Sequence, residues 1–125
     1  MTNVFLVMLG GSLGALSRYG ASLLAVTLFG SRFPWGTLAV NLVGCFFIGL
    51  AFALAERGSG IMSPSMRLFF VTGYLGGLTT FSTYALETTN ALGAQDSMSA
   101  VLNFAANNLL GVALVLLGMW MVRLR

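Results

Sequence analysis

The 125-residue sequence contains no histidine and no lysine, and charged residues make up only 7% of it. Its carboxylates come from three residues alone, Glu56, Glu87 and Asp96. The chain shows no cluster of metal-ligating side chains and no nucleophile paired with a base, which excludes the usual arrangements of enzyme active sites. The composition therefore predicts that the protein is not an enzyme.

Cysteine and clustered basic residues are also missing. Cys45 is the single cysteine and stands in an apolar run, so we expect a small packing residue rather than a disulfide within the chain. The net charge is +3, but the six arginines are scattered along the sequence, unlike the basic stripe of a nucleic-acid-binding protein. No nucleic-acid partner is expected.

The chain is instead rich in long apolar segments. Apolar residues make up 58% of it, and a helix of about 20 such residues spans the hydrocarbon core of a bilayer. Short polar or Gly/Pro turns separate four segments of suitable length, and the first segment resembles a retained span rather than a signal peptide. We predict an all-α membrane protein whose residues 1–125 form a single four-helix transmembrane domain. The four predicted spans cover residues 4–28, 37–54, 67–92 and 100–122.

Arginine placement predicts an orientation. An even number of crossings puts both termini on one side, and that side carries Arg57, Arg67, Arg123 and Arg125, whereas the opposite loops carry only Arg32. Because short cytoplasmic loops are enriched in basic residues, we expect cytoplasmic termini. Arg18 is left out because it lies inside the first span.

The third span contains an unusual stretch, residues 73–84, in which glycines and hydroxyl side chains replace the expected apolar residues. The pair Gly76 and Gly77, followed by threonines and serine, weakens a helix. We therefore predict a break in this helix, with Gly73, Gly77 and Thr80 serving the break and its packing. Unpaired backbone at membrane depth survives only where protein or a polar cavity covers it, so the break predicts a binding site.

Small or polar side chains recur along one face of each of the other spans. They are Gly11, Gly14, Ala15 and Arg18; Thr37, Asn41, Cys45, Gly49 and Ala53; and Asn103, Asn107, Gly111 and Gly118. Such faces let membrane helices pack closely, which explains each one taken singly. Taken together with the break, these polar residues exceed what packing requires.

Two charged residues in the spans allow two interpretations each. Arg18 either extends to the membrane interface or anchors the break and attracts an anion. Glu87 either is solvated near a helix end or belongs to a pore mouth, since it shares a face with Thr80, Thr83 and Tyr84. We treat both as candidates for a polar vestibule or an anchoring role.

Three segments together resemble the Fluc/CrcB family of fluoride channels. They are residues 10–19 (GGSLGALSRY), residues 36–44 (GTLAVNLVG) and residues 73–84 (GYLGGLTTFSTY) followed by Glu87, in the order and spacing of that family. The resemblance implies a fluoride-selective channel in the cell (inner) membrane that passively exports cytoplasmic fluoride. It also implies a homodimer with subunits in opposite orientations, which is an antiparallel, dual-topology dimer enclosing two fluoride pathways.

The family's functional residues map onto positions in this chain. Fluoride only accepts hydrogen bonds, and the amide of Asn41 and the electropositive ring edges of Phe81 and Tyr84 can face it. The family usually has phenylalanine where this chain has Tyr84, which keeps the ring edge and adds a hydroxyl. A central sodium ion is expected at the backbone carbonyls of Gly76 and Thr79. Further candidates for a polar track are Thr37, Ser82, Thr83 and Asn107.

Other assemblies and functions stay open from the sequence. The arginine bias opposes equal insertion in both orientations, so a heterodimer with a homologous chain is the alternative to the favoured homodimer. A small multidrug transporter shares the length and helix number, but it needs a carboxylate in the first helix, where this chain has only Arg18. An accessory membrane subunit fits the composition and leaves the break unexplained.

Overall fold

The computed structural model describes residues 1–58 and 60–124, which form helices and connecting turns. The expected turn residue Ser59 and the basic residue Arg125 lie outside the described residues. The first two spans are the continuous helices α1 (Thr2–Phe29) and α2 (Trp35–Glu56). The last is a rod made of α6 (Ser97–Ala105), the π-helical segment η2 (Ala106–Leu110) and α7 (Gly111–Arg123).

The third span is divided, as predicted. It begins with α3 (Pro64–Met66), the π-helical segment η1 (Arg67–Leu75) and α4 (Gly76–Leu78), and it resumes with α5 (Phe81–Gly93). The all-α fold with four membrane-length segments and a broken third helix is therefore confirmed.

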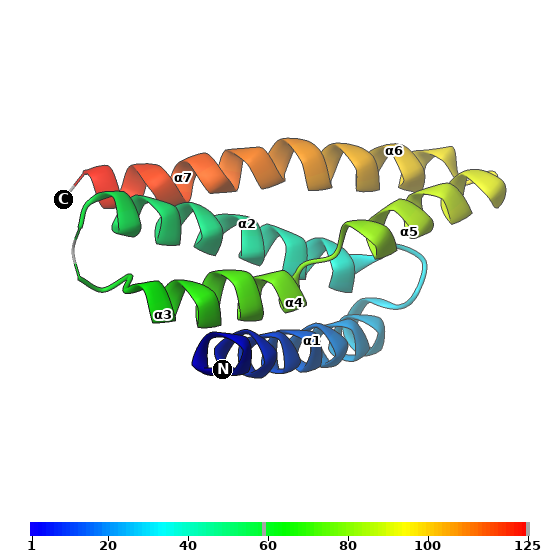
Figure 1. The fold of residues 1–125 in the computed structure, drawn as a ribbon. Helices are drawn as coiled ribbons and strands as arrows, with labels where there is room; N and C mark the ends of the chain where they lie inside the picture. Colours follow the sequence, from blue (N-terminus) through cyan, green and yellow to red (C-terminus); the bar gives the residue numbers. More distant parts are fainter. Residues whose placement is uncertain (59, 125) are drawn as a thin grey trace.

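The chain runs back and forth between two ends of the molecule (Figure 1). Both termini and the connection from α2 to α3 lie toward one end, and the connections from α1 to α2 and from α5 to α6 lie at the other. The first end carries Arg57, whose Nη1 donates to the Val122 carbonyl at 3.0 Å, and Arg123, which pairs with Glu56 at 3.3 Å. Arg32 belongs to the opposite end, so the described arginines divide between the ends as the sequence predicts.

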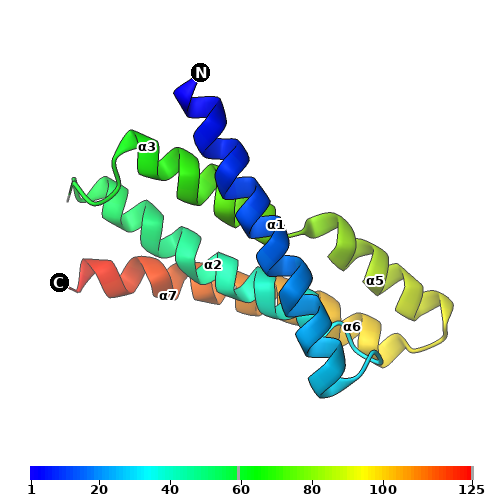
Figure 2. The ribbon, with the colours of Figure 1, turned by 90° about the horizontal axis from the view of Figure 1, so that it is seen from below.

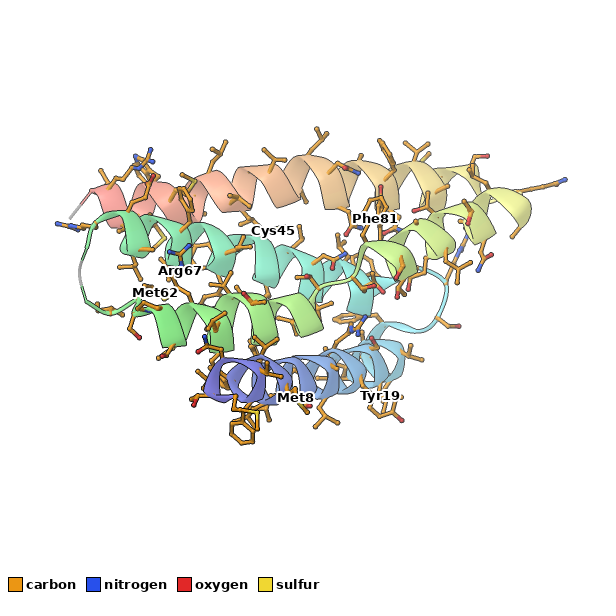
Figure 3. The ribbon with its side chains drawn as sticks, viewed as in Figure 1. Met8, Tyr19, Cys45, Met62, Arg67 and Phe81 are labelled. Atoms are coloured by element: carbon orange, nitrogen blue, oxygen red, sulfur yellow. The ribbon has the colours of Figure 1, made fainter. Side chains whose placement is uncertain are left out.

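Within the described residues, three helical rods are long and apolar enough to cross a membrane, namely Thr2–Phe29, Trp35–Glu56 and Ser97–Arg123. Large apolar side chains cover the outside of the bundle. Met8 and Tyr19, for example, are 64% and 65% exposed and point away from the other helices (Figure 3). Surfaces of this kind suit contact with lipid, and the chain is a multi-pass membrane protein.

Glycines set how closely the helices approach. α1 crosses the third span obliquely (Figure 2). A Cβ added at Gly14 would lie 2.1 Å from the Tyr74 carbonyl oxygen, and a Cβ added at Gly77 would lie 2.5 Å from the Gly11 carbonyl oxygen. Likewise, a Cβ at Gly118 would lie 2.3 Å from the Phe46 carbonyl oxygen on α2. Backbone therefore packs on backbone at these contacts, as small-residue faces allow in membranes.

The glycines do not make the break, and this part of the prediction is wrong. Gly73 lies within η1 and Gly77 within α4, and both pack against α1. The helix ends only after Leu78, at the two threonines that follow. Close packing against α1 is the physical reason for glycine at these positions.

Candidate functional site

The break consists of Thr79 and Thr80, whose backbones are extended. Their φ and ψ angles are −82° and 156° for Thr79, and −152° and 117° for Thr80. Threonine suits a break of this kind, because it favours an extended backbone and its hydroxyl can cap the helix that follows. Thr80 Oγ1 accepts from the Thr83 N–H at 3.2 Å and so caps the N-terminus of α5.

Asn41 on α2 pairs with the backbone of the break. The Thr80 N–H donates to Asn41 Oδ1 at 2.8 Å, and Asn41 Nδ2 donates back to the Thr80 carbonyl at 3.2 Å. One carboxamide thereby satisfies both backbone polar groups of the residue at which the helix is interrupted. This pairing lowers the cost of breaking a helix at membrane depth, because both backbone polar groups of Thr80 have partners.

The same hydrogen bonds release two carbonyls. In a continuous helix the Thr80 N–H would bond the Gly76 carbonyl, and the Thr83 N–H would bond the Thr79 carbonyl. Asn41 Oδ1 takes the first donor and Thr80 Oγ1 takes the second. The two carbonyls that were expected to face a cation are therefore without the donors that a helix would supply.

A chain of amides extends from Asn41 across the bundle. The second Nδ2 hydrogen of Asn41 donates to Asn107 Oδ1 at 2.9 Å, and Asn107 Nδ2 donates to Asn103 Oδ1 at 2.9 Å. Asn103 is 1% exposed and donates to Thr88 Oγ1 at 2.9 Å on α5. Both amide hydrogens of Asn41 are thus engaged within the chain, and its expected contact with fluoride stays a prediction.

A cavity of about 320 Å³ opens beside the break, and we call it the break groove. It brings together seven of the predicted site residues from α2, the third span and η2. Phe81 is 77% exposed at the start of α5 (Figure 3), and its ring meets that of the buried Tyr84 edge-on, with centroids 5.4 Å apart. The groove is lined by Asn41, Gly44, Cys45, Ile48, Val71, Leu75, Gly76, Thr79, Thr80, Phe81, Tyr84, Asn107 and Asn108.

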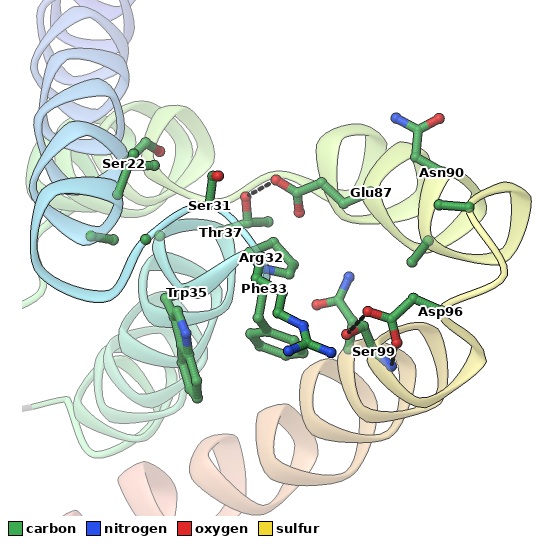
Figure 4. Close-up of a pocket in the computed structure, with 18 residues that line it drawn as sticks. Ser22, Ser31, Arg32, Phe33, Trp35, Thr37, Glu87, Asn90, Asp96 and Ser99 are labelled. Atoms are coloured by element: carbon green, nitrogen blue, oxygen red, sulfur yellow. Dashed lines mark hydrogen bonds between the residues drawn. The ribbon is translucent and has the colours of Figure 1, made fainter.

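Thr37 and Glu87 lie in a second cavity, of about 380 Å³, near the turns that join α1 to α2 and α5 to α6 (Figure 4). Thr37 Oγ1 donates to Glu87 Oε1 at 2.7 Å. The other carboxylate oxygen, Oε2, is buried and has no hydrogen-bond partner in the described part of the chain. Arg32 and Asp96 also line this cavity, and the vestibule role expected for Glu87 stays a prediction.

Other predicted residues line neither cavity. Ser82 is exposed on the first turn of α5, and Thr83 accepts a hydrogen bond from Thr80 Oγ1 at 3.0 Å. Arg18 is half-buried on α1, which contributes no residue to the lining of the groove. The structure therefore gathers the break, the aromatic pair and the amides, and leaves these three outside.

Sequence reasoning missed the part played by the fourth span. Asn103 holds the amide chain to α5, and Asn108 Nδ2 donates to the Tyr84 hydroxyl at 2.8 Å. The π-helical turn η2 contains Asn107 and Asn108 in succession, and such turns often occur at functional sites. Two adjacent asparagines in an apolar span were the signal available in the sequence.

The sequence of this chain matches a known protein family. The family model described as "CrcB-like protein, Camphor Resistance (CrcB)" matches residues 5–119. A protein from a Shewanella species is 45% identical over 122 residues, which cover 98% of this chain and 97% of the relative. A relative from Salinibacter ruber is 47% identical over 94% of this chain and 87% of its own length. A relative from Aeromonas salmonicida is 46% identical over 93% of this chain and 92% of its own length. All three relatives carry the name "Fluoride-specific ion channel FluC".

Proposed function

The chain belongs to the CrcB family, and from this premise we propose that it is a fluoride-selective channel that lets the anion cross a membrane passively. Relatives that this chain matches over nearly their whole length are named as fluoride-specific channels. A passive pore also requires no catalytic groups, in agreement with the lack of histidine.

The break groove is the observation that carries the proposal. Phe81 and Tyr84 place ring edges beside the N-terminus of α5, whose first N–H groups have no acceptor in their own helix. Ring edges and helix N-termini are both electropositive. A small anion that has lost water would find donors here that replace its hydration, which is the requirement for conduction.

We propose that two copies of the chain are needed to complete the pathway. The groove is open on one side, and Phe81 is too exposed in a single chain to enclose an ion. A second copy in the opposite membrane orientation would cover the groove and form two pathways. The division of arginines between the two ends keeps a heterodimer with a homologous chain as the alternative.

We also propose a sodium ion at the centre of this dimer. The described residues offer no group of three or more His, Cys, Asp or Glu side chains for a metal, but carbonyl oxygens suit a hard cation. The carbonyls of Gly76 and Thr79, released by Asn41 and Thr80, would hold it together with those of the second copy. Such an ion supplies positive charge that offsets the desolvation of a nearby anion.

The proposed role is protection from fluoride in the cell membrane of a bacterium. Hydrogen fluoride is a weak, uncharged acid that diffuses into a cell and ionises in the near-neutral cytoplasm. A pore in the inner membrane would let a negative-inside potential drive the trapped anion out. No proton-coupling residue is required, and Glu87, on α5 rather than α1, does not stand where a multidrug transporter needs its carboxylate.

The proposal is tested with purified protein in liposomes loaded with potassium fluoride and chloride, in the presence of sodium. We expect fast release of fluoride after addition of valinomycin, measured with a fluoride electrode, and no release on a parallel chloride electrode. Empty liposomes and liposomes without valinomycin are the controls. Folded dimers that release no fluoride would contradict a homodimeric channel, and release of both anions would contradict selectivity.

A further inference from the structure

The hydroxyl of Tyr84 has a hydrogen-bond partner that determines its direction. Asn108 Nδ2 lies 2.8 Å from this hydroxyl and 2.8 Å from the carbonyl of Phe104. A carbonyl only accepts hydrogen bonds, so the side of the Asn108 carboxamide that faces Phe104 must be its nitrogen. The same nitrogen then donates its second hydrogen to Tyr84.

This assignment leaves the Tyr84 hydroxyl with a free hydrogen. The oxygen is engaged as an acceptor from Asn108, so the hydroxyl must donate elsewhere. Within residues 1–58 and 60–124, no protein acceptor takes this hydrogen. Buried hydroxyls normally find a partner, so a donor without one marks a place where a ligand can bind.

The hydroxyl stands where an anion would pass in the proposed channel. Tyr84 and Asn108 both line the break groove, and the Tyr84 ring meets Phe81 edge-on within it. The side chain of Tyr84 is only 6% exposed, because the fourth span covers one side of it. Its ring is therefore held in place, with Tyr84 lining the break groove.

We propose that the Tyr84 hydroxyl donates a hydrogen bond to fluoride in the break groove, and that Asn108 is a positioning residue that keeps this hydroxyl a donor. The inference rests on the proposed function, and it adds a hydroxyl ligand to the ring edges expected there. Hydrogen bonds between a hydroxyl and an anion are short and strong. The smaller fluoride ion approaches such a donor more closely than chloride does, so Tyr84 favours fluoride.

The first test is Tyr84→Phe, which removes the hydroxyl and keeps the ring. Fluoride conductance is recorded across a planar bilayer as a function of fluoride concentration. We expect the half-saturating concentration to rise by about fivefold or more, because a hydrogen bond to a charged group is lost. The matched control is Tyr19→Phe, on the outer face of α1, which leaves the half-saturating concentration unchanged.

The second test separates positioning from packing. Asn108→Leu has a similar volume and no donor, so the Tyr84 hydroxyl can turn its hydrogen toward other acceptors. We expect a higher half-saturating concentration from Asn108→Leu alone, and no further rise when it is added to Tyr84→Phe. A purely structural role would instead lower the yield of folded dimers and add to the effect of Tyr84→Phe.

The outcomes distinguish this inference from the proposed function. If the unaltered protein conducts no fluoride, the proposed function fails, and this inference fails with it. If the unaltered protein conducts and Tyr84→Phe has the same half-saturating concentration, only the hydroxyl ligand is disproved. Equal effects of Asn108→Leu in the presence and absence of the hydroxyl would disprove the positioning role.

Discussion

Asn41 joins the backbone of the break to the rest of the bundle through a single carboxamide. Its oxygen accepts from the Thr80 N–H, and its nitrogen donates to the Thr80 carbonyl and to Asn107. A carboxylate of the same shape could accept the first of these bonds but could not make the other two. This residue therefore tests the break and the anion pathway together.

We expect Asn41→Asp to abolish fluoride release from liposomes. The new carboxylate places negative charge beside the proposed pathway, and its second oxygen faces two acceptors instead of donating to them. Fluoride-electrode efflux and size-exclusion chromatography measure flux and assembly, and we expect the dimer to persist. Asn3→Asp, at the start of α1, is the control for the chemical change, and unaltered flux in Asn41→Asp would remove Asn41 from the pathway.

Phe81→Ile tests the aromatic edge. Isoleucine keeps an apolar side chain at the start of α5 but has no ring, so the electropositive edge facing the groove is lost. We expect fluoride efflux to fall about tenfold or more, since the ring edge substitutes for water around the ion. The matched control is Phe5→Ile, whose side chain is 63% exposed on α1, and equal rates in both variants would mean that Phe81 only packs.

At this scale, the sequence predicted the residue types better than their partners. The family resemblance points to Asn41, Phe81 and Tyr84, and the groove brings them together. The bond between Asn108 and Tyr84 could not be predicted, because it joins two spans across the bundle and depends on the π-helical turn η2. Contacts between elements depend on how the elements pack, and the periodicity of the sequence does not specify that packing.

At the scale of the elements, the third span shows that a side chain of another helix can stabilise a break in a helix. Only two extended residues separate α4 from α5, and a side chain from α2, that of Asn41, pairs with the backbone of the second of them, Thr80. The sequence predicted the break within a few residues, because hydroxyl residues weaken a membrane helix. It assigned the wrong cause to the glycines, because their close contact with α1 depends on tertiary structure.

Gly77→Ala separates packing from breaking. A Cβ at this position would lie 2.5 Å from the Gly11 carbonyl oxygen, so α1 must move away from α4. We expect the free energy of unfolding, measured by denaturant titration in detergent, to fall by about 1–3 kcal/mol. Gly20→Ala is the matched control, because nothing lies within 4 Å of its added Cβ.

A larger substitution, Gly77→Leu, is expected to prevent normal assembly for the same reason. Normal stability and flux in Gly77→Leu would show that α1 and α4 do not pack as described.

Asp96 caps the N-terminus of α6, and we expect this cap to make the stability of the protein depend on pH. Its carboxylate accepts from the Ser99 hydroxyl at 2.8 Å and from the Ser99 N–H at 3.1 Å, which lowers the pKa of Asp96 below its usual value. A carboxyl whose pKa is lower in the folded state stabilises that state above its unfolded pKa, and the effect is lost as the pH falls through the folded pKa. We expect Asp96→Ala to be less stable than the unaltered protein near neutral pH.

That stability difference should shrink as the pH is lowered from about 7 to about 3, when measured by thermal unfolding. Ser97→Ala, one residue further along the same turn, is the control and should not show this pH dependence. A difference that stays constant with pH would mean that the Asp96 charge does not contribute to the cap.

For the whole molecule, the exposed groove and the released carbonyls both point to a partner. One chain supplies only the carbonyls of Gly76 and Thr79, and a second copy would double the number of oxygens available to the proposed cation. The four-helix layout and the end-to-end division of arginines could be predicted from the sequence. The opposite orientation of a partner stays a prediction from the family resemblance, because it depends on contacts that a single chain does not contain.

Sodium removal tests the proposed centre of the assembly. If released carbonyls from two copies hold the ion, replacing sodium with a large organic cation should lower dimer stability and slow fluoride efflux. We expect both to recover when sodium is returned, as measured by crosslinking and by the fluoride electrode. Efflux that does not depend on sodium would contradict the ion site and leave the channel proposal standing.

The dependence of the break on Asn41 and on the fourth span has a consequence for synthesis of the protein. Residues emerge from the ribosome in order, so α2 enters the membrane before Thr80 does, while Asn103 and Asn107 follow later. A newly inserted third segment therefore has one of its stabilising amides but not the residues that hold that amide in place. We therefore expect this segment to reach its final shape only after the last helix has entered the bilayer, so that the break would be completed late in assembly rather than at insertion.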